Sequence, residues 1–490
     1  MLRYWNPKLL HLEVERYGYH FSASSYMRYL CCIYLGIAGF SFAFQLKLPY
    51  ILFVMAIASI FIPKAFLLMY QNLYEEKRFE DLVAYMEQIL YSFKRRAKIL
   101  TALEDTSLLF HEEESSIYSA IQRAILHIRG AQTNGDIYEE AFAMIENEYG
   151  CKRLYKVHDF LRKVERLGGI SDTSIEILLQ DRKLWMDRVY EMQKEKKNIK
   201  IKITIGIGLS FLICAMSVWM LPKEFRITQN AISQIITAFV IIGNLLLWYV
   251  AQKKLSGSLV LSEEEMDEQT AEKNQAILNK EDNSLQRKAR GMACVFLLLT
   301  IFLFWKVNLF SGILGMLVVF WCLYYPKHKY KLAKKWMRKE VEKKFPEWLM
   351  SVSLQLQTDN VHVSLEKSVS DAPQILQPEL TELLRGIEQN PGSLQPYINF
   401  MRGIDLPEIV SAMKILYSMA EFGAEEMGKQ IDMLVQRNAI LMDKAERLRQ
   451  EDILAGVGFL VLLPMVTGVI KMLIDLVLVI FHILSLVNTV

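Results

Sequence analysis

Apolar and polar residues alternate along this chain in long blocks. Apolar stretches occupy residues 29–44, 50–70, 203–221, 231–250, 292–305, 309–325 and 453–490. Two polar blocks, 71–202 and 326–452, lie between them. About 20 apolar residues are enough to cross the roughly 30 Å hydrocarbon core of a bilayer. The pattern therefore predicts pairs of membrane-spanning helices that carry two large blocks in water.

The last apolar block is too long for one crossing. As a single helix its 38 residues would extend about 57 Å. Lys471 and Asp475 interrupt it, so we expect two spans that turn near Lys471 and eight spans in total. One span followed by an interfacial helix is the alternative, with seven spans. Asp475 and His482 are ionisable groups in this block, and we expect packing roles for them, with a functional role as the alternative.

Both polar blocks have the period of helices with one buried face. In the first block, apolar residues recur every three or four positions, and glycines such as Gly150 and Gly168 mark helix ends. Alternating β-branched runs are nearly absent, so the block predicts an all-α bundle of five or six helices. In the second block, we expect prolines to mark helix starts: Pro346, Pro373, Pro378, Pro391, Pro396 and Pro407.

The two polar blocks also resemble each other. Phe79–Asp105 aligns without a gap on Phe345–Asp371 at an offset of 266, and Leu154–Gly168 aligns on Ile409–Gly423 at an offset of 255. Each block then ends in a long charged helix that runs into an apolar stretch. The expected fold is therefore all-α: a polytopic helical membrane protein with two duplicated cytoplasmic helical bundles.

The positions of Lys and Arg set the expected orientation. With eight spans, only Lys47, Lys223, Arg226, Lys306 and Lys471 of the 57 basic residues fall in outer loops, which places both polar blocks in the cytoplasm. The expected order is a cytoplasmic lead-in (1–28), hairpin 1 (29–70), bundle 1 (71–202), hairpin 2 (203–250), a cytoplasmic linker (251–290), hairpin 3 (291–325), bundle 2 (326–452) and the C-terminal membrane segment or segments (453–490).

Composition and motifs argue against catalysis. The net charge is only +3, so no basic field favours nucleic acid, and the six cysteines have no metal-ligand spacing. A phosphate-binding G-x-x-x-x-G-K-[ST] loop does not occur. His111 begins a zincin-like string but lacks its second histidine, and we expect His158 to lie on a solvated helix face. We expect no catalytic, cofactor-binding or metal residue, no cofactor and no enzymatic activity.

Two charged corners are the candidate partner contacts. One is basic, with Lys94, Arg95, Arg96 and Lys98 in bundle 1, and the other is acidic, with Glu421, Glu425 and Glu426 in bundle 2. Opposite charges on two related bundles would suit asymmetric binding of one cytoplasmic partner. Solvated helix faces are the alternative interpretation of both corners.

The repeated segments, together with Arg162–Trp185, resemble the type II secretion F domain, the inner-membrane platform of type II secretion systems and type IV pili. The arrangement is similar to the two platform proteins of Tad (Flp) pili joined in one chain. Where the family often has a glycine, this chain has Arg95–Arg96 and Asn360–Val361.

The resemblance implies a multi-pass protein of the bacterial inner membrane and a non-enzymatic role in pilus assembly. The implied partners are a cytoplasmic secretion or assembly ATPase, pilin-like subunits, membrane lipid and further copies of the chain. A membrane transporter and a membrane signalling scaffold are the alternatives.

Overall fold

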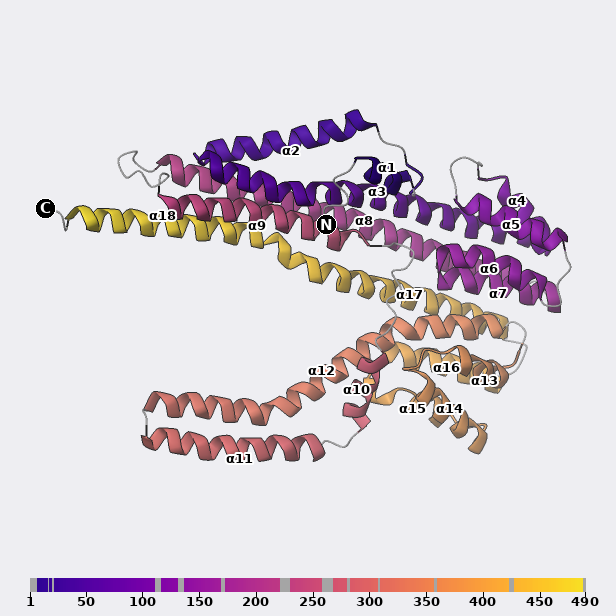
Figure 1. Cartoon of the computed structure of the whole chain (residues 1–490). Coiled ribbons are helices and arrows are strands. Elements are labelled where there is room, and N and C mark those ends of the chain that lie inside the picture. Colours follow the sequence, from indigo (N-terminus) through magenta and orange to yellow (C-terminus); the bar gives the residue numbers. More distant parts are fainter. Residues whose placement is uncertain are drawn as a thin grey trace. The chain divides into compact units, whose positions relative to one another are not determined.

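The computed structural model describes residues 7–15, 17–19, 22–110, 116–130, 136–168, 172–220, 230–257, 268–279, 283–306, 309–356, 359–422 and 427–487 (Figure 1). All regular elements in these ranges are α-helices or 3-10 helices and none is a strand, which confirms the all-α prediction. The chain divides into two compact units. Unit 1 comprises 1–170, 185–263 and 450–490, and unit 2 comprises 171–184 and 264–449.

The apolar helices that are long enough to cross a membrane lie wholly or mainly in unit 1. In the described ranges there are five such segments: Ser24–Ala43, Leu48–Arg95, Ser174–Met216, Ala231–Leu255 and Lys429–Leu484. They belong to α2 (Ala23–Ala43), α3 (Leu48–Arg95), α8 (Asp172–Met220), α9 (Ala231–Leu255) and the pair α17 (Met427–Gly458) and α18 (Leu463–Val487). The chain is thus an all-α membrane protein with several candidate spans.

The predicted turn near Lys471 is wrong. The helix instead breaks earlier, at the 3-10 turn η5 (Phe459–Val461), and α18 then runs unbroken through Lys471 and Asp475. The two residues are four positions apart and form an ion pair, so neither charge requires a turn into water. A continuous helix also keeps its backbone groups bonded in lipid. Lys471 is therefore not an outer-loop residue.

A helical bundle forms the rest of unit 1. It consists of the second half of α3, α4 (Ile99–Ser107), α5 (Ser116–Gly130), α6 (Ile137–Tyr149), α7 (Lys152–Leu167) and the adjoining part of α8, while α1 (Pro7–Glu15) packs against α3. Along α3, apolar residues recur at three- and four-residue steps, the period of a helix with one buried face, and all of them are buried: Phe79, Leu82, Met86, Ile89, Leu90 and Phe93. Gly150 adopts the left-handed conformation that ends α6, as its position predicts.

Unit 2 contains a helical hairpin and a second bundle. Helices α11 (Asn283–Lys306) and α12 (Leu309–Gln355) lie side by side, and α10 (Glu268–Asn279) packs against α12 (Figure 1). The bundle adds α13 (Val361–Asp371), α14 (Gln377–Gln389), α15 (Gln395–Asn399), η4 (Arg402–Ile404), α16 (Pro407–Phe422) and the first part of α17. Its core is built around Phe345, Trp348 and Leu416.

The prolines mark helix starts only in part. Pro378, Pro396 and Pro407 lie in the first turns of α14, α15 and α16, as predicted. Pro373 and Pro391 lie in turns between helices. Pro346 was expected to open a helix, but it lies inside α12, which continues from the hairpin into the bundle.

The internal repeat has matching helices. Helices α7 and α16 have 16 residues each, and both their ends differ by the predicted offset of 255. Within each unit the equivalent residues face the local core: Leu154 and Ile409 are both buried, as are Leu161 and Leu416. Two sequences with the same buried positions on helices of the same length are what a duplication predicts.

Candidate functional site

The basic corner of bundle 1 surrounds the break between α3 and α4. Lys94 and Arg95 lie in the last turn of α3, Arg96 caps it, and Lys98 directly precedes α4. The Arg95 guanidinium is 2.6 Å from the carboxylate of Asp105, and the Lys98 ammonium is 3.9 Å from that of Glu165. Part of the positive charge of this corner is therefore already paired within the bundle.

Glu165 stabilises this break from a different helix. Its carboxylate accepts a hydrogen bond from the backbone N–H of Ile99 at 2.7 Å, so it serves as the missing cap of α4. It also accepts one from the Tyr138 hydroxyl at 2.9 Å. Burial, followed by this bond to Glu165, raises the pKa of Tyr138 to about 12. One largely buried carboxylate thus connects α4, α6 and α7.

In unit 2 the equivalent helix, α13, is capped by the residue directly before it. The side chain of Asn360 accepts a hydrogen bond from the N–H of Val363 at 3.0 Å and caps α13. The helix–break–helix segment therefore forms in both units without a glycine.

The acidic corner is only partly described. Glu421 is exposed in the last turn of α16. Glu425 and Glu426 lie outside the described residues. The structure therefore places one of the three acidic residues, on a surface where it can meet solvent or a partner.

His158 is buried, and the expectation that it lies on a solvated face is wrong. Only 1% of it is exposed. Its ring stacks on Phe142 at 3.9 Å, with Tyr85 Oη 2.9 Å from Nε2 and Glu146 Oε1 2.8 Å from Nδ1. A carboxylate only accepts, so Nδ1–H donates to Glu146 and the Tyr85 hydroxyl donates to Nε2. The charged residues around His158 in the sequence hide this apolar environment.

Burial lowers the pKa of His158, and its hydrogen bond to Glu146 opposes that shift only partly. Burial also raises the pKa of Tyr85 well above its usual range. Both side chains are therefore neutral near pH 7 and connect α3, α6 and α7. The arrangement is suited to packing rather than to proton transfer with a substrate.

A second buried cluster lies among the candidate spans of unit 1. Lys471 and Asp475 of α18, 1% and 2% exposed, form an ion pair with each other. Ser233, in the first turn of α9, lies 3.1 Å from the Lys471 ammonium and 3.2 Å from Asp475 Oδ1. Its hydroxyl can accept from Lys471 and donate to Asp475. The other carboxylate oxygen, Oδ2, has no hydrogen-bond partner among the described residues.

Small and polar residues continue this contact along α8, α9 and α18. Thr467 of α18 lies 3.0 Å from Asn244 of α9 and 3.4 Å from Ser210 of α8. Gly468 and Gly206 allow the close approach: a Cβ on Gly468 would lie 2.8 Å from the Ser210 hydroxyl. Interhelical hydrogen bonds and small residues are how spans associate in lipid, where the hydrophobic effect does not drive their contact.

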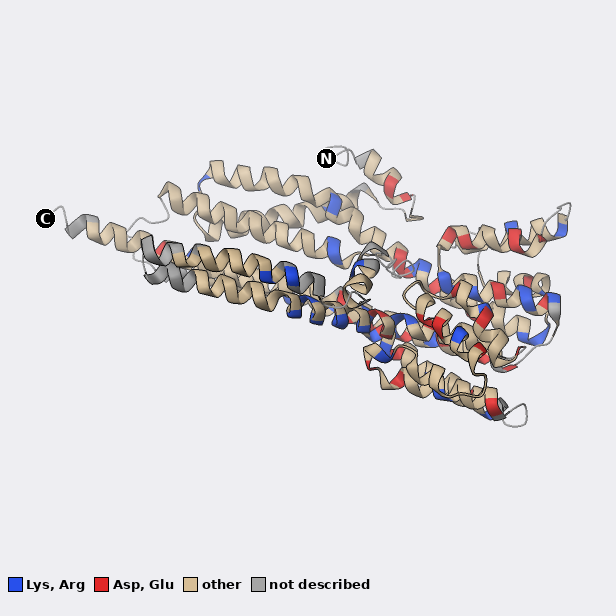
Figure 2. Cartoon of the chain, turned by 90° about the horizontal axis from the view of Figure 1, so that it is seen from below, with Lys and Arg blue, Asp and Glu red and all other residues tan. Residues whose placement is uncertain are grey.

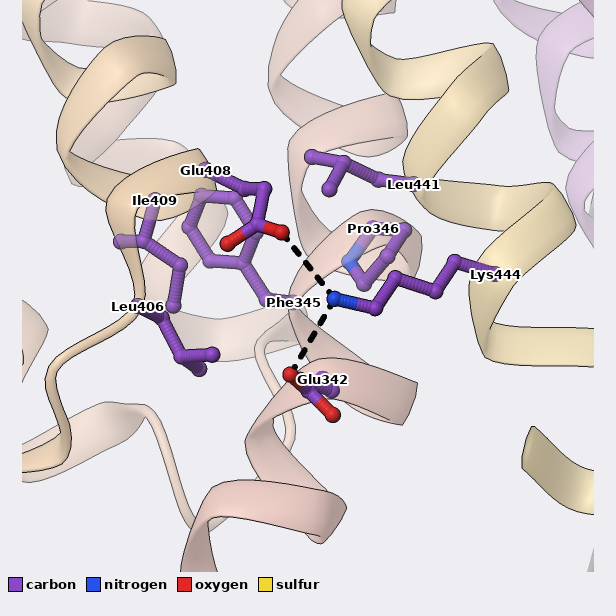
Figure 3. A pocket seen from close by; sticks show the side chains of 8 residues that line it. All are labelled: Glu342, Phe345, Pro346, Leu406, Glu408, Ile409, Leu441 and Lys444. Atoms are coloured by element: carbon purple, nitrogen blue, oxygen red, sulfur yellow. Dashed lines mark hydrogen bonds and ion pairs between the residues drawn. The ribbon is translucent and has the colours of Figure 1, made fainter.

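One small hollow lies in bundle 2 (Figure 3). The Lys444 ammonium points between two carboxylates, 3.3 Å from Glu342 and 3.0 Å from Glu408. Burial alone would lower the pKa of Lys444, but the two carboxylates raise it. Glu408 has a lowered pKa because of its own backbone N–H and Lys444. With a volume of about 10 Å³, the hollow has room for about one water molecule, so it is not a ligand site.

In the part of the chain that the structure describes, no three His, Cys, Asp or Glu residues gather as metal ligands would.

Comparisons with protein-family models, with curated proteins and with solved structures find no match to this chain. The fold and the buried clusters therefore define a class, an all-α membrane protein with attached helical bundles. Its function must be argued from the repeat and from its connection to the spans.

Proposed function

We propose that this chain is the inner-membrane platform protein of a type IV filament machine, similar to Tad pilus or type II secretion platforms. One observation carries the proposal: in each half of the repeat a continuous helix runs from an apolar segment into the bundle, α3 in the first half and α12 in the second. In this proposal the protein is multi-pass in the bacterial inner membrane and both bundles are cytoplasmic. The repeat, the family resemblance of Phe79–Asp105 and Phe345–Asp371, and the distribution of basic residues support it.

The unbroken helices suit a mechanical role. Helix α3 has 48 residues and α8 has 49, so each is about 72 Å long at 1.5 Å per residue. In α3 the apolar half leads directly to Phe79 and the bundle core. Pro63 lies inside the apolar half of α3, but no proline lies between it and the bundle core, so this continuous part of the helix can pass a displacement of the bundle to the span. A force applied to the bundle would therefore move membrane helices.

The proposed source of that force is a separate cytoplasmic secretion ATPase, because this chain contains no phosphate-binding loop. Pilin-like subunits leaving the membrane would be the load, and several copies of the chain would surround them. The exposed charges of the α3–α4 break and of Glu421 are the proposed contacts with the ATPase.

The direct test is co-purification of the full-length protein with the secretion ATPase produced from the same cells. Lys94→Glu and Arg96→Glu should together reduce the recovered ATPase at least tenfold, because they reverse two charges of the proposed contact. Lys152→Glu and Lys414→Glu, on exposed positions of α7 and α16, are the control with the same charge change. Wild-type protein that recovers no ATPase would refute the platform function.

A transporter is the second candidate, favoured by the buried Lys471–Asp475 pair, since ionisable groups within spans often mark transport pathways. Purified protein in sealed vesicles distinguishes the two candidates. Solute or ion uptake that Asp475→Asn abolishes would establish transport, whereas a platform protein gives none.

A further inference from the structure

The hairpin of α11 and α12 is strongly basic from residue 283 to residue 339. Between residues 283 and 339 there are eleven Lys and Arg residues and no Asp or Glu. Apart from Lys306, these charges lie away from the hairpin tip (Figure 2). The feature belongs to unit 2 alone and is independent of the proposed function.

The apolar part of the hairpin carries many large apolar side chains that are exposed. Met316 is 75% exposed and Phe320 is 70% exposed, and Leu298 and Ile301 of α11 are exposed as well. Contiguous apolar surface of this kind marks a membrane or protein contact. From Leu309 to Tyr325, α12 extends about 25 Å, which is close to the depth of a bilayer core.

Aromatic residues follow the apolar part. Trp321, Tyr324, Tyr325 and Tyr330 are all exposed on α12. Trp and Tyr concentrate at the boundary between hydrocarbon and headgroups, because their rings are apolar and their edges form hydrogen bonds. These residues indicate where α12 leaves the membrane.

The basic residues begin at the same level. Lys327 and Lys331 are exposed, and Lys329 lies 5.8 Å from the ring centre of Tyr325. None of the described residues forms an ion pair with these three lysines. Further along α12 the situation changes, because Lys334 is paired with Asp405 at 3.4 Å. Lysines without an ion pair to a described residue therefore lie next to the aromatic residues.

Helix α11 adds a basic residue at the same depth as the aromatic residues and lysines of α12. A Cβ on Gly315 would lie 2.1 Å from Thr300 Cγ2, so these residues are opposite each other where the helices touch. Because the two helices run in opposite directions, Tyr325, ten residues after Gly315, is level with Arg290, ten residues before Thr300. Three residues further on, Arg287 is exposed and has no ion pair with a described residue.

We infer that Arg287, Lys327, Lys329 and Lys331 form a collar that binds the phosphate headgroups of anionic phospholipids. Four unpaired cations at an aromatic boundary, with no acidic residue on either helix at this level, are complementary to an anionic membrane surface and repel a basic one. Clusters of Lys and Arg directly beside a membrane span are a recognised way to bind anionic lipid. The lipid would fix the depth of a hairpin whose apolar length is short.

The test counts lipids retained by the purified full-length protein. Protein is exchanged into detergent containing equal amounts of phosphatidylglycerol and phosphatidylcholine, and bound lipids are counted by native mass spectrometry. Wild-type protein should retain phosphatidylglycerol preferentially, and less of it at high salt. Replacing Lys327, Lys329 and Lys331 together by Gln should weaken phosphatidylglycerol binding about 100-fold, at about fivefold for each basic residue near the surface.

Two matched variants complete the design. Lys152, Lys414 and Lys429 are exposed lysines of α7, α16 and α17, and replacing them by Gln removes the same charge without an expected effect. Replacing the three collar lysines by Arg should retain binding, which excludes misfolding as the cause of a loss. Equal retention of phosphatidylglycerol by the collar Gln variant and the wild type would overturn the inference. So would loss of an acidic protein, rather than lipid, from the collar variant.

Discussion

The Lys471–Asp475 pair provides the sharpest test of how α18 is held in unit 1. In Lys471→Met, Asp475 stays buried between α9 and α18 without its counter-ion, and in Asp475→Leu the ammonium is left alone. Breaking a buried pair by removing one partner costs about 3–5 kcal/mol. A single charge at the centre of a span costs a similar amount, about 2.5–3.5 kcal/mol on insertion scales. We expect each single variant to lose about 3 kcal/mol of unfolding free energy.

The double variant should behave differently. With both residues apolar no charge remains to be desolvated, and an apolar replacement of a buried pair is often neutral or stabilising. Only the hydrogen bonds to Ser233 are lost, at about 1 kcal/mol. We therefore expect the double variant to lie within about 1 kcal/mol of the wild type.

Reversible unfolding of the full chain in mixed micelles, with rising denaturing detergent, measures the three free energies. Leu476→Ala, at an exposed position of the same helix, serves as a control for truncation on α18. Additive losses, with the double variant less stable than either single one, would show that the two side chains do not interact as the structure has them.

Three further outcomes follow from the structure. Glu165→Ala leaves the Ile99 N–H without its acceptor and should destabilise bundle 1 by about 1–3 kcal/mol in chemical denaturation; Glu104→Ala, which breaks only an exposed pair, should cost under about 1 kcal/mol, and equal losses would contradict the capping role. Because the pKa of His158 is lowered in the folded state, the unfolded state takes up the proton first, so stability should fall as pH drops below about 6.5 and should be unchanged above it. The denaturation midpoint of the full chain between pH 5 and 8 measures this effect, and the pH dependence should weaken in His158→Gln. Gly315→Ala should force α11 and α12 apart and lower the melting temperature, with partial rescue by Thr300→Ala, whereas Gly403→Ala, where no atom lies within 4 Å of the added Cβ, should not have this steric effect.

Much of the fold was predictable because helices leave periodic patterns. The buried face from Phe79 to Phe93 follows directly from its spacing, and the offset of 255 predicts the ends of α7 and α16. These features depend on residues close in sequence, whose relation is set by the geometry of a single helix. The same reasoning located the charged corners but could not show that Arg95 and Lys98 already have partners.

The candidate sites were less predictable for a related reason. His158 lies between charged neighbours in sequence, and only the packing of α3 and α6 on α7 makes its environment apolar. Glu165 caps a helix that begins 66 positions earlier, so no local signal identifies it.

The sequence by itself determined the all-α fold, the separation into apolar and polar blocks, the repeat and the absence of a phosphate-binding loop. Only the tertiary structure decided that α18 runs straight through Lys471 and Asp475 and packs on α8 and α9, more than 200 positions away. The pattern of one helix shows which face is buried but not against which helix. That choice depends on where Ser233, Ser210 and Gly468 offer hydrogen bonds and space.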